Sequence, residues 1–117
     1  MAKVKTKDLQ DTALDWAVAK CEGLEHLFDG HDVGRHHYSS DWSLAGPITQ
    51  RERINIHYCR DLRDPNGLYI HAEADAHLHH GYWRGNHDKP LVAAMRCYVA
   101  IKMGPEIEIP DEYLESA

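Results

Sequence analysis

The sequence predicts a small α+β domain in which two main helices pack on one face of a small antiparallel sheet. Apolar residues recur at helical spacing over 11–22 and 90–103. Two runs of alternating apolar and polar residues, 54–60 and 68–78, flank a turn and predict an antiparallel hairpin. A chain of 117 residues has the size of one domain, so we expect 1–117 to fold as a unit. Layered packing favours a single sheet with its helices on one side.

The first predicted helix covers residues 11–22. Asp11 and Asp15 stand near its start, where the helix dipole favours negative charge. Gly23 follows its last turn and suits the left-handed conformation that ends many helices. The preceding residues 1–5 are expected to form a short edge strand. The apolar stripe of the helix consists of Leu9, Ala13, Leu14, Ala17, Val18 and Cys21.

Residues 24–46 have no sustained periodicity and are rich in Gly, Ser, Asp and His, so we expect a loop with short ordered pieces. Long loops in compact domains are often functional. Tyr38 and Trp42 give this loop aromatic groups for packing or binding. Pro47 suits the first position of one helical turn that runs through Arg51 and Glu52, and the start of a strand is the alternative.

The predicted hairpin joins strands 54–60 and 68–78 through the turn sequence Asp64-Pro65-Asn66-Gly67. One face of each strand is apolar and is expected to cover the core. The alanines in the second run also suit a helix over 72–79, which is the alternative there. The apolar positions are Ile54, Ile56, Tyr58, Leu68, Ile70, Ala72, Ala74, Ala76 and Leu78, and the polar face of the second strand holds Tyr69, His71, Glu73, Asp75, His77 and His79.

The last third of the chain is expected to hold a loop, a central helix and a short strand. Residues 80–88 are polar, with Tyr82 and Trp83 among them, and predict a loop. Pro90 suits the first position of a helix over 90–103, and Gly104 suits its end. This helix has little polar surface, so it should be covered on most sides. Residues 106–109 predict a strand, and the acidic tail, 110–117, is expected to be solvated.

Charge and composition exclude several classes of protein. The 13 basic and 19 acidic residues give a net charge of −6, which argues against a binder of long nucleic acid. The longest apolar run is far shorter than a membrane span, and we expect neither a membrane anchor nor a signal peptide. Three cysteines without a CxxC motif predict neither a disulfide framework nor a zinc knuckle, and fit buried thiols in a reducing compartment.

The ten histidines raise the question of a metal site. His71, Glu73, His77 and His79 share one face of the second hairpin strand, and imidazole and carboxylate suit divalent transition metals. His57 on the first strand joins that face only if the strand register allows it. No pair fits a motif such as HExxH. A solvated polar face is the preferred interpretation, and a metal site is the minority one.

Arginines and aromatic residues alternate in and beside the predicted loops. Arginine binds phosphate or carboxylate in a fork, and aromatic rings stack on bases. A pocket of such residues would hold a nucleotide-like anion despite the negative net charge, because local charge decides local binding. The plainer alternative puts the tryptophans in the core and pairs the arginines with carboxylates. The residues concerned are Tyr38, Trp42, Arg51, Arg53, Trp83, Arg84 and Arg96.

Three blocks of the sequence resemble the NinX family of bacteriophage proteins. They are VKTKDLQDTALDWAVAKCEG at 4–23, YSSDWSLAGPITQRERI at 38–54 and KPLVAAMRCYVAIKMGPEIEIPDE at 89–112. The family carries Glu where this chain has Gln50, and the His-rich middle, 55–88, matches least. The resemblance implies a phage or prophage protein that works in the bacterial cytoplasm, and it implies no particular activity. It singles out positions in the second block that no structural need explains.

We therefore expect a non-enzymatic phage accessory protein without a cofactor, which binds a small nucleotide-like anion such as a host immune signal. Trp42 and Tyr38 would stack on the base, and Arg51 and Arg96 would meet phosphate. One alternative is an inhibitor of a host enzyme that binds through the aromatic loops. A less favoured one is a metal-dependent hydrolase using His71, Glu73, His77 and His79. We also expect a homo-oligomer. The complete predicted ligand site is Tyr38, Asp41, Trp42, Arg51, Trp83 and Arg96.

Overall fold

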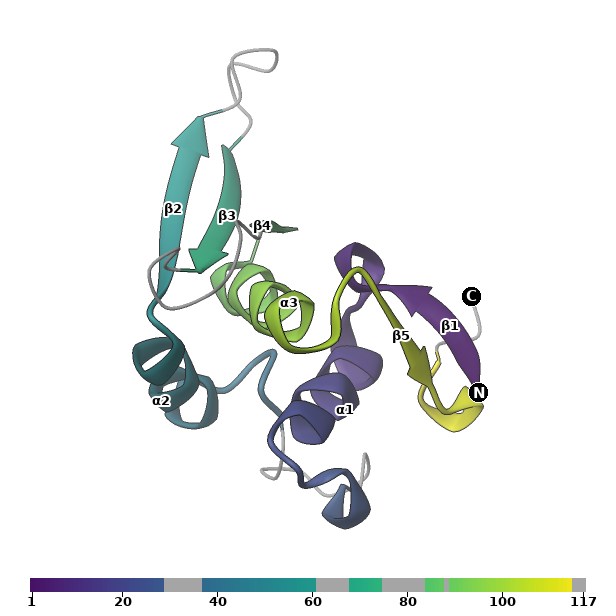
Figure 1. Cartoon of the computed structure of the whole chain (residues 1–117). Helices are drawn as coiled ribbons and strands as arrows, with labels where there is room; N and C mark the ends of the chain where they lie inside the picture. The colour runs from purple at the N-terminus through teal and green to yellow at the C-terminus, as the bar shows by residue number, and fades with distance from the viewer. Residues whose placement is uncertain (29–36, 61–67, 75–83, 88, 115–117) are drawn as a thin grey trace.

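The computed structural model describes residues 1–28, 37–60, 68–74, 84–87 and 89–114. Within them it confirms an α+β fold, with helices packed against small antiparallel sheets (Figure 1). The helices are α1 (Asp11–Cys21), α2 (Trp42–Glu52) and α3 (Pro90–Met103). The strands are β1 (Ala2–Lys5), β2 (Ile54–Arg60), β3 (Leu68–Ala74), β4 (Arg84–His87) and β5 (Glu106–Ile109).

Helix α3 is the centre of the fold, as its sequence predicts. It packs against all three strands β2, β3 and β4 on one side, and against α1 and α2 elsewhere (Figure 1). Every residue from Leu91 to Val99 is buried, including Arg96. Helix α1 supplies the second half of the core, with Leu14, Ala17 and Val18 fully buried. The predicted apolar stripe of α1 is thus confirmed, apart from Cys21, which is only half-buried.

The strands form two sheets where the sequence predicted one. β1 and β5, from opposite ends of the chain, pair antiparallel, and β2-β3-β4 form a separate three-stranded sheet. In the first pair Ile107 and Ile109 are buried, whereas Glu106 and Glu108 are exposed and lie opposite Lys5 and Lys3. In the described residues the single sheet expected from layered packing is divided in two, and α3 packs against β2, β3 and β4 of one sheet and contacts β5 of the other.

The hairpin prediction is confirmed over the described residues. β2 covers the predicted 54–60, and its register sets Ile54 opposite Ala74 and Ile56 opposite Ala72, which confirms a strand rather than a helix at 72–74. Predicted residues 75–78 lie outside the described residues. The loop predicted at 80–88 contains the four-residue strand β4, which pairs with β3. Its sequence, Arg84 to His87, shows no apolar alternation, so only its backbone pairing reveals it.

Helix α2 is the largest departure from the predicted fold. It begins at Trp42, five residues before the expected helical turn at Pro47, inside the segment predicted to be a loop. Asp41 is its N-cap, and the Asp41 carboxylate accepts hydrogen bonds from the backbone N–H and the hydroxyl of Ser43. Pro47 lies in the helix interior, where proline is disfavoured. The sequence therefore predicted that a helical turn begins at Pro47 and not before it.

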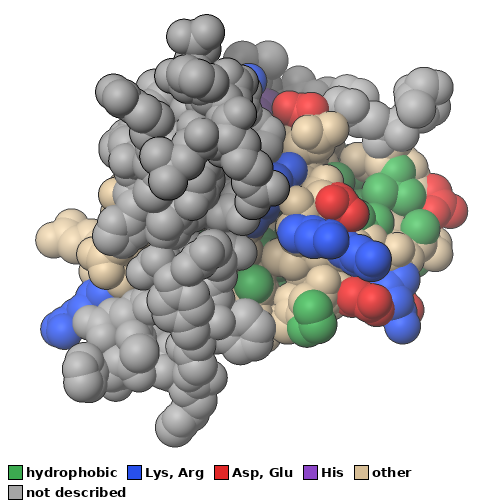
Figure 2. Space-filling model, turned by 90° about the horizontal axis from the view of Figure 1, so that it is seen from above, with side chains coloured by type: hydrophobic (Ala, Val, Ile, Leu, Met, Phe, Trp, Pro, Cys, Tyr) green, Lys and Arg blue, Asp and Glu red, His purple; other side chains and the backbone are tan. Residues whose placement is uncertain are grey.

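The surface of the described residues mixes charges of both signs. On the face shown in Figure 2, basic and acidic side chains lie next to one another. In the β1-β5 sheet, Lys3 Nζ is 3.9 Å from a Glu106 carboxylate oxygen. The chain after β5 is not wholly solvated, because the Tyr113 ring packs edge-on against Phe28, with 5.0 Å between centroids. Among the described residues, no helix has the length and apolarity needed to cross a bilayer.

Candidate functional site: a pocket between three helix N-termini

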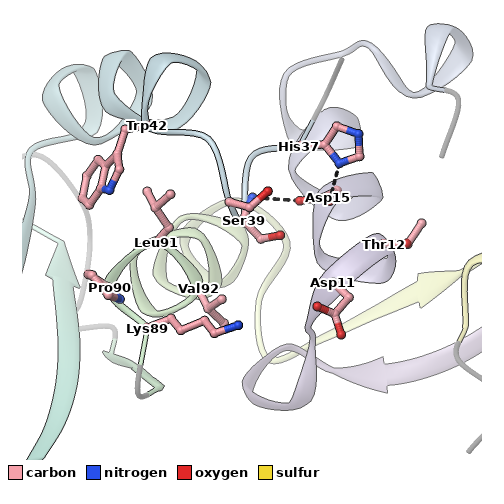
Figure 3. Close-up of a pocket in the computed structure, with 11 residues that line it drawn as sticks. Asp11, Thr12, Asp15, His37, Ser39, Trp42, Lys89, Pro90, Leu91 and Val92 are labelled. Atoms are coloured by element: carbon pink, nitrogen blue, oxygen red, sulfur yellow. Dashed lines mark hydrogen bonds and ion pairs between the residues drawn. The ribbon is translucent and has the colours of Figure 1, made fainter. Parts of the chain in front are cut away.

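A pocket of about 440 Å³ lies where the first residues of three helices meet (Figure 3). Asp11 opens α1, Trp42 opens α2 and Pro90 opens α3. Helix N-termini carry partial positive charge and N–H groups that have no acceptor within the helix. The Asp41 carboxylate already caps α2, whereas α1 and α3 have no side-chain cap, so their N-termini are the two that favour a polar or anionic group. The described lining residues are Asp11, Thr12, Asp15, His37, Ser39, Ser40, Trp42, Lys89, Pro90, Leu91 and Val92.

Asp15 forms a buried polar wall of the pocket. Its carboxylate accepts a 2.8 Å hydrogen bond from the backbone N–H of Ser39, and its second oxygen is 3.7 Å from His37 Nδ1. Burial raises the pKa of Asp15, and the nearby charge of Asp11 adds to this, while Ser39 and His37 lower it. These contacts tie the segment before α2 to α1 (Figure 3), so they shape the pocket.

Asp11 and Lys89 bring opposite charges to the pocket from two helices. Their side chains extend toward each other from the start of α1 and from the N-cap of α3 (Figure 3). Asp11 has a φ of 52°, a left-handed backbone conformation that costs most residues energy but that aspartate tolerates. Lys89 is exposed, and it is the one Lys or Arg among the described lining residues.

Trp42 is the aromatic member of the site. Half of its surface is exposed. Its indole extends from α2 toward the side of the pocket that Pro90 and Leu91 line (Figure 3). The alternative in which Trp42 belongs to the core is therefore wrong. An exposed ring beside a polar pocket is available for stacking on a planar ligand.

Arg51 does not line this pocket. Its guanidinium makes 3.1 and 2.7 Å hydrogen bonds to the two carboxylate oxygens of Glu22, a 2.8 Å bond to Glu52, and a 3.1 Å bond to the Tyr98 hydroxyl. Although burial opposes it, hydrogen bonding from Arg51 and Tyr98 lowers the pKa of Glu22. The interpretation in which arginines pair with carboxylates therefore holds for Arg51.

The other predicted site residues lie apart from the pocket lining or outside the residues that the structure describes. Tyr38 is buried in the core at 5% exposure, and Arg96 is buried and donates a 2.6 Å hydrogen bond from Nε to the Leu9 carbonyl. Asp41 caps α2 beside Trp42. Trp83 lies outside the described residues. Of the six predicted residues, Trp42 is thus the one that the structure places in the pocket lining.

Sequence reasoning missed most of the polar lining. Asp11 and Asp15 were explained by the helix dipole, and Lys89 was not singled out. The usable signal was their shared placement at helix starts, because three such ends tend to gather where helices pack around one core. Ser39 and His37 gave no signal, since their contacts with Asp15 depend on the path of the chain between α1 and α2.

The strand register answers the open question about the histidines. In the backbone register His57 lies directly opposite His71, and Glu73 follows two residues further along β3. His77 and His79 lie outside the described residues. Among the residues whose side chains are described, no group of three or more metal-ligating side chains occurs. The metal site stays the minority prediction that the sequence gives.

One comparison identifies the family. The family model described as Bacteriophage P22, NinX matches residues 5–102, which span α1, α2 and almost all of α3. No curated protein sequence matches the chain. The matched range also contains every described residue of the pocket lining. Since the match covers far more than half of the sequence, the chain belongs to the bacteriophage P22 NinX family, as the three sequence blocks predicted.

Proposed function

We propose that this phage protein is a non-enzymatic binder of a small nucleotide-like anion, held in the pocket between the three helix N-termini. The observation that carries the proposal is the half-exposed Trp42 at a pocket of about 440 Å³. Pockets of a few hundred Å³ with a few convergent polar groups are typical of small-molecule sites. An exposed tryptophan at such a pocket suits a ligand with a planar ring.

The ring of the ligand is assigned to Trp42. Stacking of a base on an aromatic side chain contributes about 1–3 kcal/mol and tolerates different bases. The apolar side chains of Pro90 and Leu91 line the same part of the pocket and would cover the edge of the ring.

The anionic group of the ligand is assigned to the start of α3. Lys89 supplies an ammonium group, and the N–H groups of Leu91 and Val92 belong to the first turn, which has no acceptors for them within the helix. A helix N-terminus together with a lysine favours phosphate. These groups take the role that the sequence had given to Arg51 and Arg96.

Hydroxyl groups of a sugar are assigned to the opposite wall. Asp11 offers a carboxylate acceptor, and Asp15, Ser39 and Ser40 also line this wall. A carboxylate that accepts from a hydroxyl makes a strong, charge-assisted hydrogen bond. The pocket then has separate places for a ring, a sugar and a phosphate.

Isothermal titration calorimetry with a panel of cyclic and linear nucleotides tests the proposal. We expect at least one to bind with one-to-one stoichiometry, and Trp42→Ala to weaken its binding at least about fivefold, since stacking contributes about 1–3 kcal/mol. Lys89→Ala is expected to weaken binding similarly. Lys7→Ala is the matched control, because Lys7 is exposed and lies outside the pocket lining.

Two results would overturn the proposal. One is the absence of binding by every nucleotide in the panel to the folded protein. The other is binding that Trp42→Ala and Lys89→Ala leave unchanged, which would place the ligand elsewhere. A host protein captured only by the chain with Trp42 intact, together with no nucleotide binding, would favour the enzyme-inhibitor alternative instead.

A further inference from the structure

A buried carboxylate joins helix α1 to the segment that leads into α2. Asp15 belongs to α1, and its carboxylate accepts the 2.8 Å hydrogen bond from the backbone N–H of Ser39 (Figure 3). Its second oxygen lies 3.7 Å from His37 Nδ1. Hydrogen bonds to a carboxylate are among the stronger ones in proteins. Asp15 therefore holds the backbone of residues 37–39 against α1.

Hydrogen bonds continue from this segment into the first turn of α2. The backbone N–H groups of Ser40 and Asp41 donate to the His37 carbonyl, at 3.1 and 2.9 Å. Asp41 is the N-cap of α2, and the next residue is Trp42. A run of hydrogen bonds thus leads from the Asp15 carboxylate to the turn that carries the Trp42 ring.

Trp42 depends on its backbone for its position, because half of its own surface is exposed. The buried residues that pack α2 into the core, Ala45 and Ile48, come later in the helix. Before the helix, the Tyr38 side chain is buried in the core, and Asp15 holds the backbone N–H of the residue that follows Tyr38. The start of α2 is therefore anchored from α1 at two adjacent residues and not by the ring itself.

We propose that Asp15 is a positioning residue of the pocket, which acts on the ligand through Trp42 by holding the segment that places the indole ring. The inference rests on the proposed function, because it concerns the same ligand. It goes further in that it makes affinity depend on a buried carboxylate that needs no contact with the ligand. It also predicts that the Asp15–Ser39 hydrogen bond and ligand binding strengthen each other, since coupling between two sites is reciprocal.

NMR spectra of the free protein test the first half of the inference. Asp15→Leu keeps the branching of the side chain at Cγ but leaves the Ser39 N–H without its acceptor, whereas Asp15→Asn keeps an acceptor. We expect the indole N–H signal of Trp42, assigned with Trp42→Ala, to move in Asp15→Leu and to stay in place in Asp15→Asn. Tyr98→Phe is the control, because it removes a hydrogen bond to Arg51 away from the pocket lining and should leave this signal unchanged.

Calorimetry with a nucleotide that binds tests the second half. We expect Asp15→Leu to weaken binding roughly tenfold, and Asp15→Asn and Tyr98→Phe to bind nearly as tightly as the unmodified protein. In the Trp42→Ala background, Asp15→Leu should cost little further affinity, because a residue that acts through the ring has no effect once the ring is removed. A loss of stability alone would not produce this dependence on Trp42.

Hydrogen exchange at the Ser39 amide gives a measurement on the unmodified protein, which decides the matter if Asp15→Leu does not fold. A saturating nucleotide should slow this exchange, because of the reciprocal coupling. An unchanged Trp42 signal in folded Asp15→Leu, strictly additive losses of affinity with Trp42→Ala, or unchanged exchange at Ser39 would each overturn the inference and leave the proposed function intact. If no nucleotide binds, the proposed function fails and the effect on a ligand fails with it, while the indole signal still shows whether Asp15 places Trp42.

Discussion

The surroundings of a side chain distinguish the residues of this protein that serve the fold from the one that we assign to a ligand. Asp15 is a buried carboxylate whose two oxygens face Ser39 and His37, and Arg51 is held by two glutamates and a tyrosine. Trp42, in contrast, leaves half of its surface exposed beside a pocket. The first two residues are explained by packing and pairing within the chain. For the exposed ring we propose a ligand as the explanation.

Asp15→Asn is expected to raise the free energy of unfolding at neutral pH. The carboxyl pKa is 3.8 without the fold and higher in the folded protein, chiefly because of burial. The folded state therefore binds the proton more tightly, and Asp15 reduces stability as pH rises from 3.8 through the raised value. Asparagine keeps an acceptor for the Ser39 N–H and has no charge to bury.

Urea denaturation of both proteins between pH 3 and 8 measures this effect. The difference in stability should be small at the acidic end and should grow as Asp15 ionises. Asp8→Asn serves as the control, since Asp8 is exposed. A variant that is less stable than the unmodified protein at neutral pH would show that the His37 pair outweighs the burial cost.

At the level of elements, the ends of the helices decide both the fold and the site. Helix α1 ends before Gly23, which has a φ of 76°, and α2 ends at Arg53, which has a φ of 53°. Both positions need the left-handed conformation, but only the first has the residue suited to it. The end of α1 therefore carries a glycine signal in the sequence, whereas the end of α2 carries none.

Exchanging glycine and non-glycine residues at these two ends should change stability in opposite directions. Gly23→Ala is expected to cost about 1 kcal/mol through backbone strain, because the left-handed conformation penalises a Cβ and no atom lies close enough to clash with it. Arg53→Gly is expected to stabilise the folded protein by about 0.5 kcal/mol. The relief of backbone strain favours the folded state, and the greater conformational entropy of glycine in the unfolded state offsets part of this gain. Thermal and chemical denaturation measure both changes. Equal signs for the two variants would contradict the assignment of strain to these positions.

Strands and helices differ in how far their sequence predicted them. The ranges of α3, β2 and β5 were predicted in full, because periodicity and flanking Pro or Gly agreed. The N-terminal part of α2 was missed because Pro47, expected to open a helical turn, lies in the interior of the helix, and β4 was missed because its pairing is a backbone property. In the site, Trp42 was predicted, but Asp11, Asp15 and Lys89 were not. Their convergence depends on how three helices pack, which no local pattern records.

At the scale of the whole molecule, the three helices come together differently at their N-terminal and C-terminal ends. The N-terminal ends of α1, α2 and α3 meet at the pocket. At the other ends, Glu22 after α1, Arg51 and Glu52 in α2, and Tyr98 and Lys102 in α3 form a connected cluster. This cluster therefore links the three helices to one another at these ends. The predicted homo-oligomer and the absence of binding to long nucleic acid stay predictions.

Tyr98→Phe tests the cluster. The ring stays in the core, but its hydrogen bonds with Glu22 and Arg51 are lost, at an expected cost of about 1–2 kcal/mol. Those bonds help to hold the pKa of Glu22 in the folded protein below its ordinary value of 4.5. The stability that the ionised Glu22 contributes is therefore fully present above pH 4.5, and it is lost as the pH falls through the lowered pKa. In the variant the folded pKa of Glu22 lies closer to 4.5, so the variant should lose less stability on acidification than the unmodified protein, and the loss should end at a higher pH.

A double-mutant cycle with Glu22→Gln measures whether these residues act together. We expect Tyr98→Phe to cost less in the Glu22→Gln background than in the unmodified chain, because one of its partners has changed already. Chemical denaturation at neutral pH gives the four free energies. Strictly additive changes would contradict a cluster that connects the three helices.

The central claim is that the pocket beside Trp42 binds a small anionic ligand with a planar ring. The most direct measurement is an NMR titration with cyclic and linear nucleotides, followed at the indole N–H of Trp42 and the amide N–H groups of Leu91 and Val92. We expect these three signals to shift together and to saturate, while the amide signal of Lys102, in the cluster at the other end of α3, stays in place. Saturable shifts that avoid the pocket, or no saturable shift with any nucleotide, would contradict the claim.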